Sequence, residues 1–142
     1  MLVTERKAAR QLPYDAAWLV FDSVGPLVNG FAAITVAILH KYRLAISAPC
    51  IEYWILLHFQ YTDAYLCDYR AVERSLKDYC EYDKKSFDPK IILDKTGTAV
   101  NNTRMARNSQ ARVPKELPAT DMDLLVAQMN AMAHPDYRLF EA

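Results

Sequence analysis

Residues 46–59 form the most constraining stretch of this chain, because they are almost all apolar and include one acidic side chain. Pro49 stands near the beginning of the stretch, and proline fits the first turn of a helix, where its missing N–H has no partner to lose. The residues after Pro49 are apolar on nearly every face, which is typical of a helix that is buried all round. The sequence therefore predicts a buried helix here, around which the rest of the chain packs.

Glu52 is the acidic side chain in this stretch, and it needs a partner. A buried carboxylate loses several kcal/mol of hydration unless a cation or hydrogen-bond donors compensate. The candidate partners of Glu52 are a metal ion, the side chain of Arg43, or the amides and positive dipole end of its own first helical turn. His58 lies about 240° further round the helix, so it shares no face with Glu52. We expect His58 to be a hydrogen-bonded core histidine.

The length and charge of the chain restrict its class. With 142 residues the chain is expected to form a single domain, 1–142. Its 17 basic and 17 acidic side chains cancel, so any binding to nucleic acid or anionic lipid must be local. The apolar stretch is too short to span a bilayer, and residues 1–10 are too charged for a signal peptide, which predicts a cytoplasmic protein without a membrane anchor.

The three cysteines, Cys50, Cys67 and Cys80, are odd in number and have no Cys-x-x-Cys spacing. This pattern argues against a disulfide framework or a zinc site and favours buried or half-buried thiols.

The N-terminal half has the pattern of a strand–helix–strand unit. Residues 16–21 form a continuous apolar run that ends at Asp22, which predicts a strand buried on both faces of a parallel sheet. Residues 29–42 have helical apolar spacing, and residues 44–46 form a second short strand. Such a unit strongly favours parallel strands, so Asp22 and Ser47 should share the carboxyl edge where α/β sheets hold ligands.

Residues 14–60 are thus expected to form a βαβ-helix core, and residues 61–142 a mainly helical part. The apolar spacing in that part predicts helices at 69–79, at 98–108 and from Thr120 or Asp121 to Pro135. Residues 82–89 are expected to be a charged loop, and residues 109–118 a basic loop.

Residues 47–59 read Ser-Ala-Pro-Cys-Ile-Glu-Tyr-Trp-Ile-Leu-Leu-His-Phe. They resemble the signature of the RloB-like family, approximately Ser-Asn-Pro-Cys-Phe-Glu-x-Trp-Leu-Leu-Leu-His-Phe, from which Ala48 and Ile51 depart. The strand ending at Asp22 is similar to the family's strand that ends in Val-Phe-Asp-x-Asp. Weaker similarity extends the resemblance from about Tyr14 to the C-terminus.

The resemblance implies a TOPRIM-like or Rossmann-like core: a small parallel sheet with flanking helices. It also implies membership of anti-phage defence or restriction-linked systems, often beside an ATPase partner, and a Mg²⁺-dependent nuclease site. Mg²⁺ prefers carboxylate oxygens and water, and it stabilises charge on a scissile phosphate. Asp22 and Glu52 are then the expected metal ligands and catalytic residues. Lys84 resembles a family lysine that follows a tyrosine, and it would neutralise phosphate charge.

Two departures from the family pattern weaken this metal site. Val24 occupies the second position of Asp-x-Asp and has no oxygen with which to coordinate a cation. The residues before Tyr14 offer no counterpart of the family's earlier strand and its Glu-Gly turn. We therefore expect a weak or inactive nuclease, and the alternative is a non-catalytic interaction module of the same type of system.

Each candidate residue also has a plain structural interpretation. Asp22 would be a loop cap, Glu52 a dipole-stabilised helix residue, and Lys84 part of a solvated loop. The main basic concentration could contact a nucleic-acid backbone or could be an ordinary solvated face. It consists of Arg104, Arg107, Arg112 and Lys115.

Overall fold

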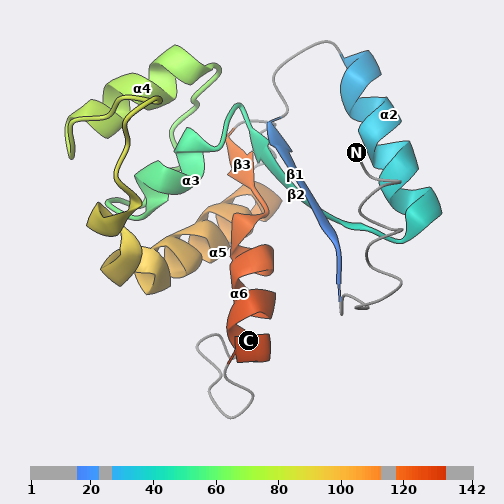
Figure 1. The fold of residues 1–142 in the computed structure, drawn as a ribbon. Coiled ribbons are helices and arrows are strands. Elements are labelled where there is room, and N and C mark those ends of the chain that lie inside the picture. Colours follow the sequence, from blue (N-terminus) through green and yellow to red (C-terminus); the bar gives the residue numbers. More distant parts are fainter. Residues whose placement is uncertain (1–15, 23–26, 113–117, 134–142) are drawn as a thin grey trace.

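The computed structural model describes residues 16–22, 27–112 and 118–133 (Figure 1). The expected strand–helix–strand unit is present as β1 (Trp18–Asp22), α2 (Leu27–His40) and β2 (Arg43–Ala48). β1 and β2 pair in parallel, with Asp22 opposite Ser47. The predicted parallel pairing is confirmed, and both strands end at the same edge of the sheet.

The sheet as a whole is mixed, so the prediction of a parallel sheet is wrong at one edge. β3 (Ala119–Thr120) pairs antiparallel with the end of β2, giving the order β1-β2-β3. The buried hydroxyl groups of Ser47 and Thr120 lie 2.8 Å apart and share a hydrogen bond. A two-residue strand is too short to show the alternating pattern by which strands are recognised in a sequence.

The predicted buried helix is confirmed as α3 (Glu52–Leu57), in which all six residues are buried. The helix is shorter than expected and has Ile51 at its N-cap. Pro49 therefore does not occupy the first helical turn, and that prediction is wrong. Pro49 belongs instead to the connection from β2, where a cis peptide bond joins it to Ala48.

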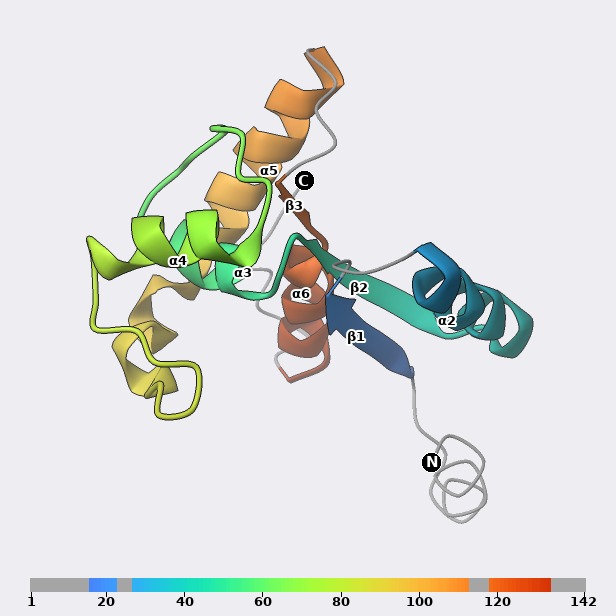
Figure 2. The same ribbon diagram turned by 90° about the horizontal axis from the view of Figure 1, so that it is seen from above.

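The main hydrophobic core surrounds α3 and not the sheet. α4 (Tyr69–Lys77) contributes Val72 and Leu76 to this core, and α5 (Thr96–Arg112) contributes Ala99 and Val100. Figures 1 and 2 show α3, α4 and α5 together on one side of the strands and α2 on the other.

Three further helical segments complete the described fold. They are the short 3-10 helices η1 (Pro89–Ile91) and η2 (Leu93–Lys95) and the helix α6 (Met122–Ala133).

β1 is less buried than the sequence predicts. Val20 is 50% exposed, so the expectation of a strand buried on both faces is wrong. The paired neighbour of β1 within the described residues is β2, and this edge position leaves part of the strand in solvent. Ile38 and Leu39 of α2 are even more exposed, at 70% and 73%.

His58 has the predicted role of a core histidine. Its side chain is 3% exposed, and its Nδ1 lies 2.9 Å from the carbonyl oxygen of Trp54. Burial lowers the pKa of His58 below its usual value of 6.5, although the backbone hydrogen bond opposes the shift.

The remaining differences concern the ends of elements and one thiol. α5 continues to Arg112, so residues 109–112 of the expected basic loop are helical. Cys67 is exposed, contrary to the expected burial, whereas Cys50 is buried and Cys80 is half-buried. No helix within the described ranges is long and apolar enough to cross a membrane. Pro135, the expected end of the last helix, lies outside the described residues.

Candidate functional site

Asp22 connects the end of β1 to the beginning of α3. Its Oδ1 accepts a hydrogen bond of 2.8 Å from the backbone N–H of Ile51, the N-cap residue of α3. Backbone N–H groups at a helix start have no intrahelical acceptor, and a carboxylate there also opposes the positive end of the helix dipole. Asp22 therefore acts as a helix cap from another element, as its plain structural interpretation predicts.

Glu52, the next residue after Ile51, is 1% exposed. The hydroxyl of Tyr82 donates a hydrogen bond of 2.8 Å to Glu52 Oε1, and Lys84 Nζ lies 3.9 Å from the same oxygen. Glu52 Oε2 is buried and has no hydrogen-bond partner among the described residues. A buried carboxylate oxygen in this state is costly, and it marks a place where a ligand could be accommodated.

Arg43, one of the partners considered for Glu52, is engaged elsewhere. Its guanidinium lies 5.8 Å from the ring centroid of Trp18, its neighbour across the β1–β2 pair. The prediction that Arg43 could pair with Glu52 is therefore wrong. Arg43 begins β2, whereas Glu52 follows the end of that strand, and the length of β2 separates the two residues.

Lys84 lies at the entrance to the buried carboxylate. Its side chain is 65% exposed, and its Nζ lies 5.4 Å from the centroid of the Tyr69 ring. The structure thus brings Lys84 close to Glu52, although 32 residues separate them in the sequence. Asp22 accepts a hydrogen bond from Ile51, which is bonded to Glu52, and the charges of Glu52 and Lys84 act on the pKa of Asp22, so the three predicted catalytic residues lie in one region. We call Asp22, Glu52, Tyr82 and Lys84 the carboxylate site.

The surroundings of the carboxylate site shift several pKa values. Desolvation raises the pKa of Asp22, and repulsion from Glu52 raises it further, while the Ile51 amide and Lys84 oppose the shift. Burial and the neighbouring Glu52 raise the pKa of the Cys50 thiol to about 12 and also raise the pKa of the Tyr82 hydroxyl. Both groups stay protonated at neutral pH, so neither is an activated nucleophile.

The carboxylate site has two side chains that could serve as ligands of a Mg²⁺ ion. Mg²⁺ is often held by one or two carboxylates, with water and substrate phosphate completing its octahedral shell. Asp22 and Glu52 supply two carboxylates, and Glu52 Oε2 is unpartnered. No group of three or more His, Cys, Asp or Glu side chains in the described part of the chain is placed to hold a metal ion. A cation held by these two carboxylates would need water or a bound ligand for the rest of its shell.

Tyr82 is the residue of this site that the sequence analysis missed. Tyr82 stands two residues before Lys84 in the same non-helical segment. This spacing was the available signal. The partner of Tyr82 could not be read from it, because Glu52 lies 30 residues earlier.

The predicted basic residues do not form one described surface. Arg107 donates to Asp123 of α6 through Nη1 at 2.9 Å and Nη2 at 2.7 Å. Asp123 is 3% exposed, so this bidentate pair joins α5 to α6 at the edge of the core. Arg104 is partly buried. The side chain of Arg112 and the whole of Lys115 lie outside the described residues, and a role in binding nucleic acid stays a prediction.

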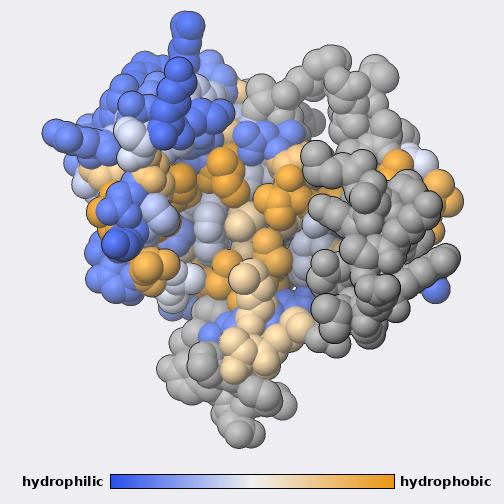
Figure 3. All heavy atoms as spheres, in the orientation of Figure 1, coloured by the Kyte–Doolittle hydropathy of each residue, from blue (hydrophilic) through white to orange (hydrophobic). Residues whose placement is uncertain are grey.

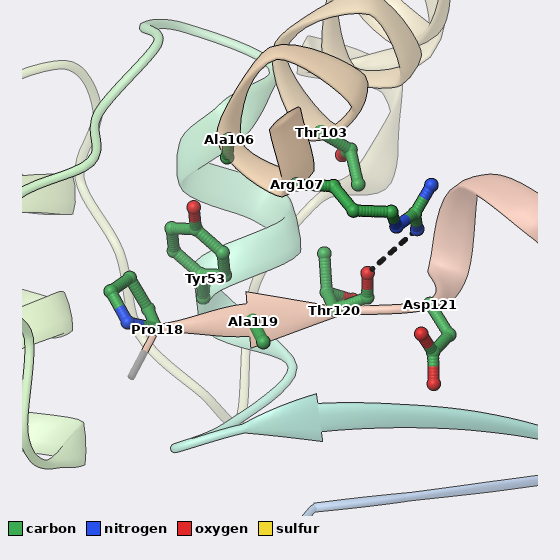
Figure 4. A pocket seen from close by; sticks show the side chains of 8 residues that line it. All are labelled: Tyr53, Thr103, Ala106, Arg107, Pro118, Ala119, Thr120 and Asp121. Carbon is green, nitrogen blue, oxygen red and sulfur yellow. Dashed lines mark hydrogen bonds between the residues drawn. The ribbon is translucent and has the colours of Figure 1, made fainter. Parts of the chain in front are cut away.

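A cavity of about 150 Å³ lies between α3, α5 and β3 (Figure 4). Figure 4 shows Arg107 reaching across it to the carbonyl oxygen of Thr120, at 3.4 Å. Its polar groups already bond within the protein, since Tyr53 donates to the Thr62 carbonyl oxygen and Asp121 accepts from the Ile46 amide. The lining residues are Tyr53, Thr103, Ala106, Arg107, Pro118, Ala119, Thr120 and Asp121. The cavity contains no member of the carboxylate site.

The fold and the carboxylate site together define a class: a small α/β protein with one carboxylate, Asp22, at the end of a parallel strand and another, Glu52, at the start of the following buried helix α3. Within that class the chain belongs to the RloB-like family, whose model, described as RloB-like protein, matches residues 2–129. The match begins earlier than Tyr14, where the resemblance in the motifs begins, and it ends before the C-terminus. The chain matches no curated protein and no solved structure at a significant level.

Proposed function

We propose that this RloB-like protein belongs to an anti-phage defence or restriction-linked system, and that its carboxylate site is a reduced Mg²⁺-dependent nuclease site on a TOPRIM-like core. The resemblance of the central motif implies this chemistry. The observation that carries the proposal is the buried carboxylate of Glu52, with Oε2 unpartnered, beside the Asp22 carboxylate at the sheet edge.

In this proposal each side chain has a defined task. Asp22 and Glu52 hold the ion, and Tyr82 fixes the orientation of Glu52 by donating to Oε1. Lys84, exposed at the entrance, binds a phosphate oxygen of the nucleic acid. The ion, when bound, supplies Lewis-acid stabilisation of the charge that develops on the scissile phosphate.

We expect this chemistry to be weak in the chain alone. A third carboxylate is missing because Val24 stands at the second position of Asp-x-Asp. In addition, Oδ1 of Asp22 already accepts a hydrogen bond from the Ile51 amide. Both features lower the affinity of the site for a cation. We propose that an ATPase partner in the same system delivers the nucleic acid to the site.

The experiment compares the purified protein with Asp22→Asn, Glu52→Gln and the surface control Asp94→Asn, whose carboxylate is 77% exposed. Mn²⁺ or Mg²⁺ should raise the melting temperature of the wild type and of Asp94→Asn, and it should leave the two site variants unchanged. Incubation with DNA, RNA and tRNA then measures cleavage. Robust cleavage that disappears in Asp22→Asn would show that the site is fully active, and a cation effect identical in all four proteins would refute the metal site.

The second candidate function is a non-catalytic interaction module. Apolar side chains in solvent favour it, because exposed apolar surface marks contact sites with other proteins. Figure 3 shows apolar residues along the centre of one face, over α6. Met129 of α6 is 62% exposed, and elsewhere in the described residues Leu39 and Ile38 of α2 are 73% and 70% exposed. This function predicts capture of a specific partner with no cation effect, and the partner should still bind Asp22→Ala.

A further inference from the structure

Lys84 and Glu52 form an unequal ion pair. Lys84 Nζ lies 3.9 Å from Glu52 Oε1, at the limit of an ion pair, and the two side chains are 65% and 1% exposed. An ammonium group that is mostly in solvent gains little from such a pair and can leave it at small cost. The carboxylate cannot follow it into water, because Glu52 is fixed in α3.

Tyr69 holds Lys84 near this position. The ammonium lies 5.4 Å from the centroid of the Tyr69 ring, within the range of a cation–π contact. Tyr69 is the first residue of α4, and its hydroxyl donates to Glu73 Oε1 at 3.2 Å. The backbone of α4 and the hydrogen bond to Glu73 thus fix the aromatic ring, and Lys84 contacts both the ring and the Glu52 carboxylate.

A divalent cation and the Lys84 ammonium would compete for the same carboxylate. Two positive charges near one buried carboxyl group repel each other, and Glu52 has one oxygen without a partner among the described residues. Tyr82, a neutral donor, is no such competitor and would stay on Oε1. Of the groups that contact Glu52, Lys84 is therefore the one that a cation would displace.

We propose that Lys84 is a displaceable counter-ion: a divalent cation bound by Asp22 and Glu52 expels its ammonium, which then binds a phosphate oxygen of nucleic acid. This inference rests on the proposed metal site, and it adds a coupling between the binding of the cation and the binding of nucleic-acid phosphate. Without phosphate, the displaced ammonium opposes metal binding. With phosphate present, it stabilises the complex, and by linkage each ligand raises the affinity for the other.

The experiment measures Mn²⁺ affinity by electron paramagnetic resonance of the free ion, a readout that needs no activity. Lys84→Met keeps most of the side-chain stem and removes the charge, and Lys85→Met is the matched control, because it removes the same charge from the next residue. Without nucleic acid, Lys84→Met should bind Mn²⁺ about two- to fivefold more tightly than the wild type, the range of a largely exposed ion pair. Lys85→Met should change the affinity less.

The titration is repeated with a DNA oligonucleotide as the phosphate probe. The oligonucleotide should tighten Mn²⁺ binding to the wild type, and this gain should be lost in Lys84→Met. Equal or weaker Mn²⁺ binding by Lys84→Met without DNA would overturn the displacement. An equal effect of DNA on both proteins, or no effect on either, would overturn the coupling. If no protein binds Mn²⁺, the proposed metal site itself fails, an outcome distinct from the others.

Discussion

Replacing Tyr82 by phenylalanine should measure how much the fold depends on satisfying Glu52. The hydroxyl and the carboxylate are both buried, at 8% and 1% exposure, and their hydrogen bond is 2.8 Å long. Removing the hydroxyl leaves a buried carboxylate beside the exposed Lys84 ammonium and the Cys50 thiol, which is a weak donor. Hydrogen bonds to charged groups contribute about 1.5–3 kcal/mol, so Tyr82→Phe should lower the free energy of unfolding by about 2 kcal/mol.

Urea denaturation gives this value directly from the midpoint and the slope. The midpoint should fall while the slope stays unchanged, because Phe fills the same space and the compactness of both states is kept. The same change in a Glu52→Leu background should leave the stability unchanged or raise it, since the Tyr82 hydroxyl has then lost its acceptor. A loss below about 0.5 kcal/mol in the wild-type background, or an equal loss in both backgrounds, would refute the reasoning.

Two further predictions concern the core. Leu57→Ala, at a fully buried position, should lower the free energy of unfolding by about 2–5 kcal/mol, measured by urea denaturation. Leu93→Ala, at a side chain that is 67% exposed, should lower it far less, and equal losses would contradict a core around α3. Because burial lowers the folded-state pKa of His58 below 6.5, the unfolded chain binds the proton first, so stability should fall as the pH drops below about 6.5. His58→Gln should reduce this loss between about pH 7 and about pH 5.5, and an unchanged pH profile of the urea midpoint would count against it.

The parts of the fold that the sequence predicted are those with a repeated local pattern. The apolar run of residues 46–59 predicted a buried helix, and α3 is buried at every position. The alternation of strand, helix and strand predicted the parallel pairing of β1 with β2. Such patterns survive because burial of one whole element requires many residues of the same kind at regular spacing.

Features made by single contacts between distant residues were not predictable in this way. β3 consists of two residues, and its partner lies 73 residues earlier. Arg107 looks like a solvated base in the sequence, yet it pairs with the buried Asp123. Each of these contacts joins residues that are far apart in the sequence, and the local spacing of apolar residues carries no information about such contacts.

The candidate site was partly predictable for the same reason. Asp22 and Glu52 follow the ends of adjacent parallel strands, so the topology alone brings them to one edge. Lys84 could be assigned to the site only through the family resemblance, because its segment has no regular structure. The contact of Tyr82 with Glu52 became known only from the structure. The catalytic and metal-binding roles of these residues stay predictions.

The hydrogen bond from the Ile51 amide to Asp22 has a consequence for how mutants of this protein are interpreted. An aspartate that caps a helix would be kept by a chain that had lost all its chemistry, so Asp22 is a poor marker of activity by itself. Alanine at this position removes the helix cap and the proposed metal ligand together. A loss of activity in Asp22→Ala would then not show which of the two losses caused it. Asparagine retains an oxygen acceptor for the amide, and it is the substitution that separates a folding defect from a chemical one.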